Sequence, residues 1–266
     1  MMAHAVAGCA NAVSRLFGRR RRLRFQGHLH QLLMPVAEVT MNGHRFRLTV
    51  PDRSAAHWPL AGIDSEPGTV RWIDSFADGD VFYDVGANVG IFSLYAATAR
   101  RCVCVAFAPN PFSFDALVRN LVVNGLEKAI FPFRFALGDN HCIAAIGIAT
   151  AEAGSVGCTL AEPDDGRLQL LTMVTTLDKI VDVAGLPFPN HLKIDVDGNE
   201  DPILAGAQTV LGDQRLRSLL VEIVCMSAER REQLTANLER LGLELVPSEG
   251  SSDNWLFRRR PGSAPR

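Results

Sequence analysis

Several features common in other protein classes are missing from this sequence. No run of about twenty uncharged apolar residues occurs, which is the length that a membrane-spanning helix needs. The small apolar residues 1–14 have no basic region before them, as a secretory signal peptide would, because the arginines follow them. The formal net charge is only −2, which gives no global field to attract nucleic acid. We therefore expect a cytoplasmic protein with no transmembrane segment and no nucleic-acid partner.

Metal-binding patterns are missing as well. Cys102-Val103-Cys104 lacks the two-residue spacer and the second cysteine pair of a zinc knuckle, so we expect no metal site. Cys102, Cys104 and Cys225 lie in apolar runs that predict buried strands, where cysteine behaves as a small hydrophobic residue. A reducing compartment is the simplest fit to these unpaired cysteines.

The first 77 residues predict an appendage to the main fold. Arg19 to Arg22 and Arg24 form a basic run, which either contacts phosphate or an anionic membrane surface or is simply a solvated arm. Alternating apolar residues around Asn42-Gly43 predict a hairpin within residues 38–50, and the prolines of residues 51–77 indicate a connector. We expect the main domain to span residues 78–260, followed by a disordered tail at 261–266.

Within residues 78–260, short apolar runs alternate with helical patterns, which predicts an α/β fold with a doubly wound, mostly parallel sheet. Its expected strands cover residues 81–85, 102–107, 129–136, 192–196 and 219–224, with helices at 91–99, 112–123, 202–211 and 228–241. Residues 243–246 and 255–257 predict a final antiparallel edge hairpin. Residues 143–148 and 168–174 predict two antiparallel strands, followed by a short helix at 177–183. In such sheets, ligands bind at the carboxyl ends of the strands.

The stretch Asp84-Val85-Gly86-Ala87-Asn88-Val89-Gly90 follows the first of these strands and opens a helix. Gly86 and Gly90 allow a tight turn and close approach to a ligand, and the helix start offers free amide donors. The carboxylate of Asp84 would repel a pyrophosphate but suits a ligand with a cationic amino group and a sulfonium, such as S-adenosylmethionine. Asn88 replaces the middle glycine of the dinucleotide pattern, which argues against a nicotinamide-dependent oxidoreductase. We expect Asp84, Gly86, Ala87, Asn88 and Gly90 to hold the cofactor.

Several further motifs follow the stretch at 84–90 in order: Phe107-Ala108-Pro109-Asn110-Pro111 with Asn120 and Asn124-Gly125, Ala136-Leu137-Gly138-Asp139, Thr176-Leu177-Asp178, Lys193 to Glu200, and Leu219 to Ile223. With these motifs, the chain resembles the FkbM family of methyltransferases over roughly residues 80–260. The resemblance implies a class I, Rossmann-like seven-stranded fold that uses S-adenosylmethionine. It also implies methyl transfer to a hydroxyl oxygen of a sugar, glycan or secondary metabolite.

The resemblance also implies two further cofactor contacts, and at one position this chain differs from the family. Asn110 stands at the second strand end, and Asp139 would face the adenine amino group, unless it is only a turn residue of Gly138-Asp139-Asn140. The family normally has a glutamate after Phe107, where it binds both ribose hydroxyls, but this chain has Ala108. Losing such charged hydrogen bonds costs about 1.5–3 kcal/mol, roughly tenfold to a hundredfold in affinity. Asn110 or a water could compensate; otherwise the chain is a weak enzyme or a non-catalytic binding module.

Charged residues on the fourth and fifth strands are the catalytic candidates. Lys193, Asp195 and Asp197 alternate, so we expect their side chains to share one face of the strand. Asp195 is the first candidate for positioning the acceptor or accepting its proton, with Lys193 as a stabiliser of oxyanion charge. Glu222 of the neighbouring strand could join the site or pair with Lys193 in a purely structural ion pair.

The remaining candidates are weaker. His141 is close to a predicted strand end, whereas His191 lies at the start of its strand, on the edge of the sheet away from the ligand. Glu200 is either a helix cap or a second-rank site residue. A small molecule or a glycan is the expected acceptor, and the oligomeric state does not follow from the sequence.

Overall fold

The structure is a computed structural model of the 266-residue chain. It describes residues 2–15, 17–61, 66–155, 159–160, 167–223, 226–247 and 253–260. The predictions for Cys225, for the last residue of the strand 219–224 and for the tail 261–266 lie outside the described residues.

The central sheet confirms the expected α/β architecture. In the described part of the chain it has seven strands in the order β12-β13-β11-β10-β3-β4-β5. These are β12 (Leu243–Leu245), β13 (Asn254–Arg259), β11 (Ser218–Glu222), β10 (His191–Ile194), β3 (Val81–Val85), β4 (Val103–Phe107) and β5 (Ile130–Phe133). The strands from β11 to β5 pair in parallel, and β13 runs antiparallel to both β11 and β12 at the edge.

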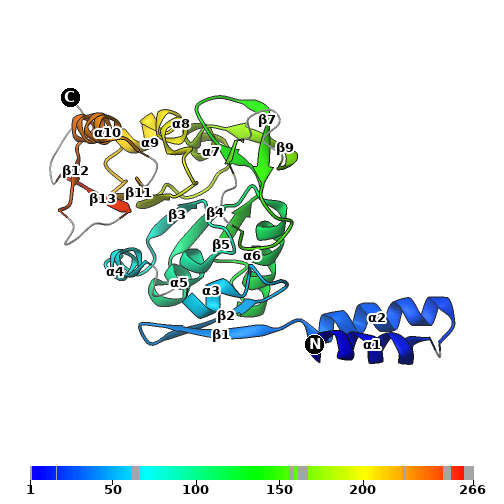
Figure 1. The fold of residues 1–266 in the computed structure, drawn as a ribbon. Helices are drawn as coiled ribbons and strands as arrows, with labels where there is room; N and C mark the ends of the chain where they lie inside the picture. Colours follow the sequence, from blue (N-terminus) through cyan, green and yellow to red (C-terminus); the bar gives the residue numbers. More distant parts are fainter. Residues whose placement is uncertain are drawn as a thin grey trace.

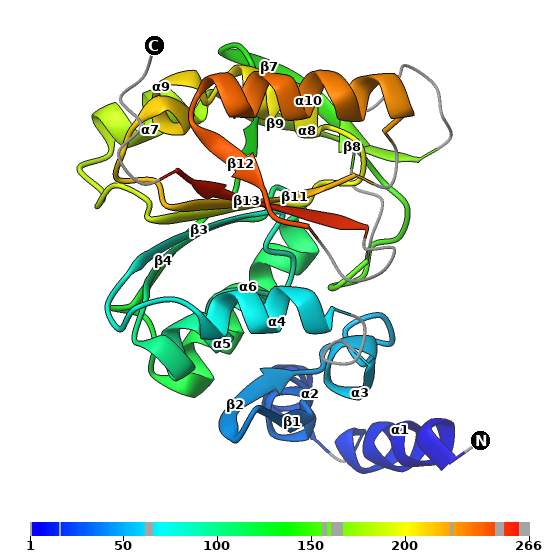
Figure 2. The same cartoon turned by 90° about the vertical axis from the view of Figure 1, so that its left-hand side faces the viewer.

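Helices cover both faces of this sheet, as Figure 2 shows. One face carries α4 (Pro67–Asp74), α5 (Ile91–Arg100) and α6 (Pro111–Asn124). The other carries α7 (Leu177–Val183), α8 (Glu200–Ala205), α9 (Gln208–Gly212) and α10 (Ala228–Arg240). Successive side chains of β3 point to opposite faces of the sheet, so Phe82 packs in one apolar core and Tyr83 in the other.

Two elements differ from the prediction near the sheet. The helix expected at 202–211 is divided into α8 and α9 at Gly206, where an added Cβ would lie 2.0 Å from the carbonyl oxygen of Gly138. The strand expected at 129–136 ends at Phe133, and the chain continues into β6 (Ala136–Leu137) of a second sheet. That sheet, ordered β6-β9-β7-β8 within the described residues, contains β7 (Cys142–Ile148), β8 (Thr159–Leu160) and β9 (Leu168–Thr175). The predicted antiparallel pair is confirmed as β7 and β9.

The hairpin predicted around Asn42-Gly43 forms from β1 (Val36–Met41) and β2 (His44–Thr49). Its alternate residues join the apolar core on the α5 side of the central sheet. Two asparagines of α6 hold it there: Asn120 accepts from the backbone N–H of Thr49 at 2.7 Å, and Asn124 accepts from that of Arg47 at 2.7 Å. The asparagines of the family-like motif therefore attach the hairpin to the main fold.

The N-terminal arm is helical, which the sequence analysis did not predict. Helices α1 (Met2–Ser14) and α2 (Arg19–Leu33) lie side by side outside the α/β body (Figure 1). The basic run forms the first turns of α2, and Gln26 donates to Asn11 at 3.0 Å between the two helices. After the hairpin, the connector includes the short helix α3 (His57–Ala61). No helix in the described residues is long and apolar enough to cross a membrane.

Candidate functional site

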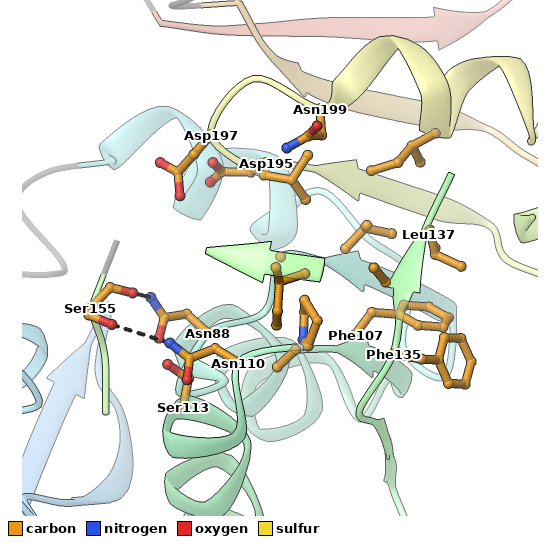
Figure 3. Close-up of a pocket in the computed structure, with 18 residues that line it drawn as sticks. Asn88, Phe107, Asn110, Ser113, Phe135, Leu137, Ser155, Asp195, Asp197 and Asn199 are labelled. Atoms are coloured by element: carbon orange, nitrogen blue, oxygen red, sulfur yellow. Dashed lines mark hydrogen bonds between the residues drawn. The ribbon is translucent and has the colours of Figure 1, made fainter. Parts of the chain in front are cut away.

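A pocket opens where β3, β4 and β10 end, at the edge of the sheet predicted for the ligand (Figure 3). One group of lining side chains is apolar and comprises Val85, Phe107, Ala108, Pro109, Phe135, Ala136, Leu137, Ile146, Val196 and Ile203. The polar and charged lining side chains are Asn88, Asn110, Ser113, Ser155, Asp195, Asp197 and Asn199. The pocket thus joins apolar walls to a row of hydrogen-bonding groups, as small-molecule sites usually do.

The loop at residues 84–90 is fixed against both neighbouring strand ends. Gly86 has φ +88°, and an added Cβ would lie 1.7 Å from the carbonyl oxygen of Asp195 beyond β10. On the other side, the N–H groups of Gly86 and Ala87 donate to the carbonyl of Phe107 at 3.1 and 2.9 Å. Gly90, with φ +87°, then begins α5. Glycine is required at 86 because both its left-handed backbone and the neighbouring carbonyl exclude a side chain.

Asn88 and Asn110 present their amide groups to the pocket from successive loops (Figure 3). Asn88 Nδ2 donates to the backbone carbonyl of Ser155 at 3.3 Å, while its buried Oδ1 has no hydrogen-bond partner among the described residues. Asn110 caps α6 by accepting from the N–H of Phe112 at 3.0 Å, and its Nδ2 donates to Ser155 Oγ at 3.2 Å. Both predicted residues therefore lie at the pocket, together with Ser155, which the sequence analysis missed.

Asp84 lies beneath this surface and does not line the pocket. Its side chain is 1% exposed, and Oδ2 accepts from Ser93 at 2.6 Å while Oδ1 has no partner in the described structure. Burial raises the pKa of the Asp84 carboxyl, although Lys193 and Ser93 oppose the shift. Asp84 is thus an internal support of the 84–90 loop.

Lys193 pairs with Asp195 on its own strand end, and not with Glu222 as the sequence analysis considered. The ammonium is buried, and its nitrogen lies 5.0 Å from the ring centre of Phe92. Burial alone would lower the pKa of Lys193, but the charges of Asp195, Glu66 and Asp84 outweigh it and raise the pKa. Lys193 therefore carries a positive charge beneath the pocket and does not line it.

Asp195 and Glu222 form a carboxyl pair above Lys193. Burial opposes ionisation of Asp195, but the charge and hydrogen bond of Lys193 and a hydrogen bond from Glu222 outweigh it and lower the Asp195 pKa. Burial, followed by the negative charge of Asp195, raises the pKa of Glu222 to about 8. At neutral pH the pair consequently holds one proton, mainly on Glu222.

Asp197 reaches the pocket from a turn, because β10 already ends at Ile194 and Asp197 has φ +56°. The expected shared strand face therefore does not extend to Asp197, although Asp195 and Asp197 both line the pocket. Glu200 closes this turn by accepting from the N–H groups of Val196 and Gly198 at 3.3 and 3.1 Å. Of its two predicted roles, the capping role is the one that these contacts support.

The other candidates lie away from the pocket. Asp139 is exposed and is not among the lining residues, and His141 contacts Thr175 Oγ1 at 2.9 Å. His191 occupies the opposite end of β10, as predicted, where its ring nitrogens contact Ser218 Oγ at 2.7 Å and Asp80 Oδ2 at 3.0 Å. The missed residues Ser113 and Ser155 are flanked by apolar residues or glycine and belong to no functional motif, so only the tertiary structure assigns them to the site.

Comparison with known proteins shows what this chain is similar to. Residues 84–239 match the methyltransferase FkbM domain. Hexuronic acid methyltransferase AglP of Haloferax volcanii is 28% identical over 71% of this chain and 73% of that protein. The 31-O-demethyl-FK506 methyltransferase FkbM of Streptomyces tacrolimicus is 30% identical over 54% of this chain and 65% of that protein. The crystal structure of methyltransferase FkbM from Methylobacillus flagellatus KT has a TM-score of 0.50 and 18% identity, over 69% of this chain and 44% of that one.

Proposed function

The chain belongs to the FkbM methyltransferase domain family, and on that basis we propose that it transfers a methyl group from S-adenosylmethionine to a hydroxyl oxygen. Two relatives point to the acceptor class, because their names specify a hexuronic acid and an O-demethylated FK506 as substrates. We therefore propose a sugar, a glycan or a secondary metabolite as the acceptor. The observation that carries the proposal is the meeting of the 84–90 loop, Asn110 and Asp195 around one pocket.

The residues of this pocket fit S-adenosylmethionine, the methyl donor of the family. Among the described lining residues, Asp195 and Asp197 are the charged ones, and their carboxylates suit a ligand with sulfonium and ammonium groups. The buried acceptor Asn88 Oδ1 needs a donor that the protein does not supply within the described residues. The apolar side chains of Phe107, Phe135 and others offer a wall for the adenine ring.

The proposed chemistry assigns separate tasks to Asp195, Glu222 and Lys193. S-adenosylmethionine, when bound, supplies a methyl group activated by its sulfonium, so the protein mainly has to position the acceptor and take its proton. Asp195 faces the pocket and orients the acceptor hydroxyl, while the Asp195–Glu222 pair takes up the hydroxyl proton. Lys193 keeps Asp195 ionised from below and is a positioning residue.

A second candidate function follows from Ala108. This residue lines the pocket at the position where the resemblance implies a ribose-binding carboxylate. A methyltransferase fold that binds the cofactor weakly and no longer turns over would have the same pocket with this one loss. Methyl transfer to any acceptor would exclude that alternative.

The test is a transfer assay with S-adenosylmethionine labelled in its methyl group, against neutral glycosides, uronic acids and polyketide alcohols. We expect a labelled product with one acceptor class. Asp195→Asn should lower turnover by about a hundredfold to ten-thousandfold. Asp182→Asn, on the exposed side of α7, is the matched control. Full turnover in the Asp195→Asn variant would refute the assignment of Asp195.

A further inference from the structure

We infer that Ser155 and Asn110 bind the ribose hydroxyls of the cofactor in place of the missing carboxylate at position 108. The inference rests on the proposed function, since it concerns the same pocket and the same ligand. It adds a binding residue, Ser155, that no sequence motif indicates. It also explains how a chain with an apolar residue at this strand end can still hold a nucleoside.

Ala108 leaves the end of β4 without a polar side chain. Its backbone N–H donates to the carbonyl of Phe133 at 3.0 Å, and the residue is 2% exposed while its side chain borders the pocket. The nearest polar side chain along this loop is Asn110, which is 4% exposed. Ser155 approaches Asn110 from the connection after β7, and the two side chains lie next to each other at the pocket (Figure 3).

The hydrogen-bonding capacity of this pair matches a ribose diol. Ser155 Oγ accepts from Asn110 Nδ2 at 3.2 Å, which leaves the serine hydroxyl proton to donate. Asn110 uses Oδ1 to cap α6, and its amide has a second N–H beyond the one given to Ser155. The Ser155 hydroxyl and the second N–H of the Asn110 amide are therefore both free to donate at the pocket. Two vicinal ribose hydroxyls can accept from these two donors and can donate to the serine oxygen.

The structure holds Ser155 in place through the residues before it. The N–H of Gly154 donates to Ser113 Oγ at 3.1 Å, and its carbonyl accepts from Trp58 Nε1 at 3.2 Å. The N–H of Ala153 donates to Asp52 Oδ2 at 2.7 Å. Gly154 has φ +76°, and an added Cβ would lie 2.6 Å from the indole nitrogen of Trp58. The connector between hairpin and main fold thus fixes the serine before any ligand arrives.

Prior fixation matters because neutral hydrogen bonds are weaker than those of a carboxylate. A serine on a free loop would lose part of its binding energy in becoming ordered, whereas Ser155 is already held by Ser113, Trp58 and the contacts of Ala153. The arrangement therefore offsets some of the affinity lost with the glutamate. It also makes cofactor binding dependent on the N-terminal connector.

Calorimetric titration with two ligands tests the inference. S-adenosylhomocysteine carries both ribose hydroxyls, and its 2′,3′-dideoxy analogue lacks them. For Ser155→Ala we expect affinity for S-adenosylhomocysteine to fall by about threefold to tenfold, with no change for the dideoxy analogue. Asn110→Ser can keep the helix cap but removes the amide donor, and we expect the same selective loss.

Matched variants separate direct contact from a structural role. Ser54→Ala removes a hydrogen bond to Glu152 outside the pocket, and we expect any effect on affinity to be equal for the two ligands. An equal loss for both ligands in Ser155→Ala, or no loss for either, would overturn the inference. In Ala108→Glu we expect a gain of less than about tenfold, since the hydroxyls already have partners; a gain of about tenfold or more would contradict this. A wild type that binds neither ligand would instead overturn the proposed function.

Discussion

Replacing Lys193 with methionine would leave a group of buried carboxylates without their cation. The methionine keeps most of the side-chain volume beneath the pocket, so the main change is the loss of charge. Asp195 and Asp84 both interact with this ammonium, and Asp195 is also hydrogen-bonded to it. Removing one partner of a buried ion pair costs about 3–5 kcal/mol, and we expect the free energy of unfolding at pH 8 to fall by that amount.

The loss of free energy of unfolding in Lys193→Met should be larger at high pH than at low pH. In the wild type, the lowered pKa of Asp195 contributes stability that is present above its unfolded value and lost as the pH falls through the folded one. In the variant, burial no longer has an opposing cation and raises the pKa of Asp195 above the unfolded value. Acidification then neutralises the uncompensated carboxylate, so the deficit should be smaller at pH 5 than at pH 8.

Urea unfolding followed by tryptophan fluorescence at the two pH values measures this deficit. Lys179→Met is the matched control, because that lysine is half-exposed on α7 and should cost no more than about 0.5 kcal/mol. Adding Asp195→Asn to Lys193→Met should restore part of the lost stability. A deficit below about 1 kcal/mol, or one that is equal at both pH values, would refute the idea that a buried charge cluster is held by Lys193.

Three further predictions concern the loop, the carboxyl pair and the opposite end of the sheet. Gly86→Ala should weaken the binding of S-adenosylhomocysteine at least about tenfold. An alanine in the left-handed conformation costs about 1–2 kcal/mol, and its Cβ would also displace the Asp195 carbonyl. Unchanged affinity would contradict this. The rate of methyl transfer should rise with pH through about 8 as Glu222 loses its proton, and Glu222→Gln should abolish this inflection; persistence of the inflection would assign it elsewhere. Burial lowers the pKa of His191 to about 4, so the unfolded state binds more protons between pH 6.5 and 4. As the pH falls from 6.5 to 4, the free energy of unfolding should therefore fall by about 3 kcal/mol in the wild type and hardly in His191→Gln. Equal pH dependence of the free energy of unfolding in the two proteins would refute the lowered pKa of His191.

The parts of the site that lie within one strand, loop and helix could be predicted from the sequence. Residues 81–100 carry an apolar strand, glycines at the turn and an apolar helix, and all three signals are local. Gly86 and Asn88 therefore line the pocket where the local pattern placed them, and Asn110 lines it where the family resemblance placed it. The order of the motifs also predicted the sheet, because parallel strands bring their carboxyl ends to one edge.

Contacts between distant segments could not be predicted in the same way. Ser155 reaches Asn110 only because Trp58 and Asp52 hold the preceding residues, and these groups are about a hundred residues apart in the chain. The partner of Lys193 was also missed, since the sequence suggested Glu222 and the structure pairs Lys193 with Asp195. Burial, followed by the charge of Asp195, raises the pKa of Glu222, and a sequence gives no direct reading of burial.

The central claim is that the pocket at the ends of β3, β4 and β10 binds the cofactor. Calorimetric titration of the wild-type chain with S-adenosylmethionine and S-adenosylhomocysteine tests it most directly. We predict saturable binding of both ligands at one site per chain, and a large loss of affinity in Gly86→Ala. Absence of saturable binding up to about 1 mM of either ligand, which corresponds to roughly 4 kcal/mol, would contradict the account.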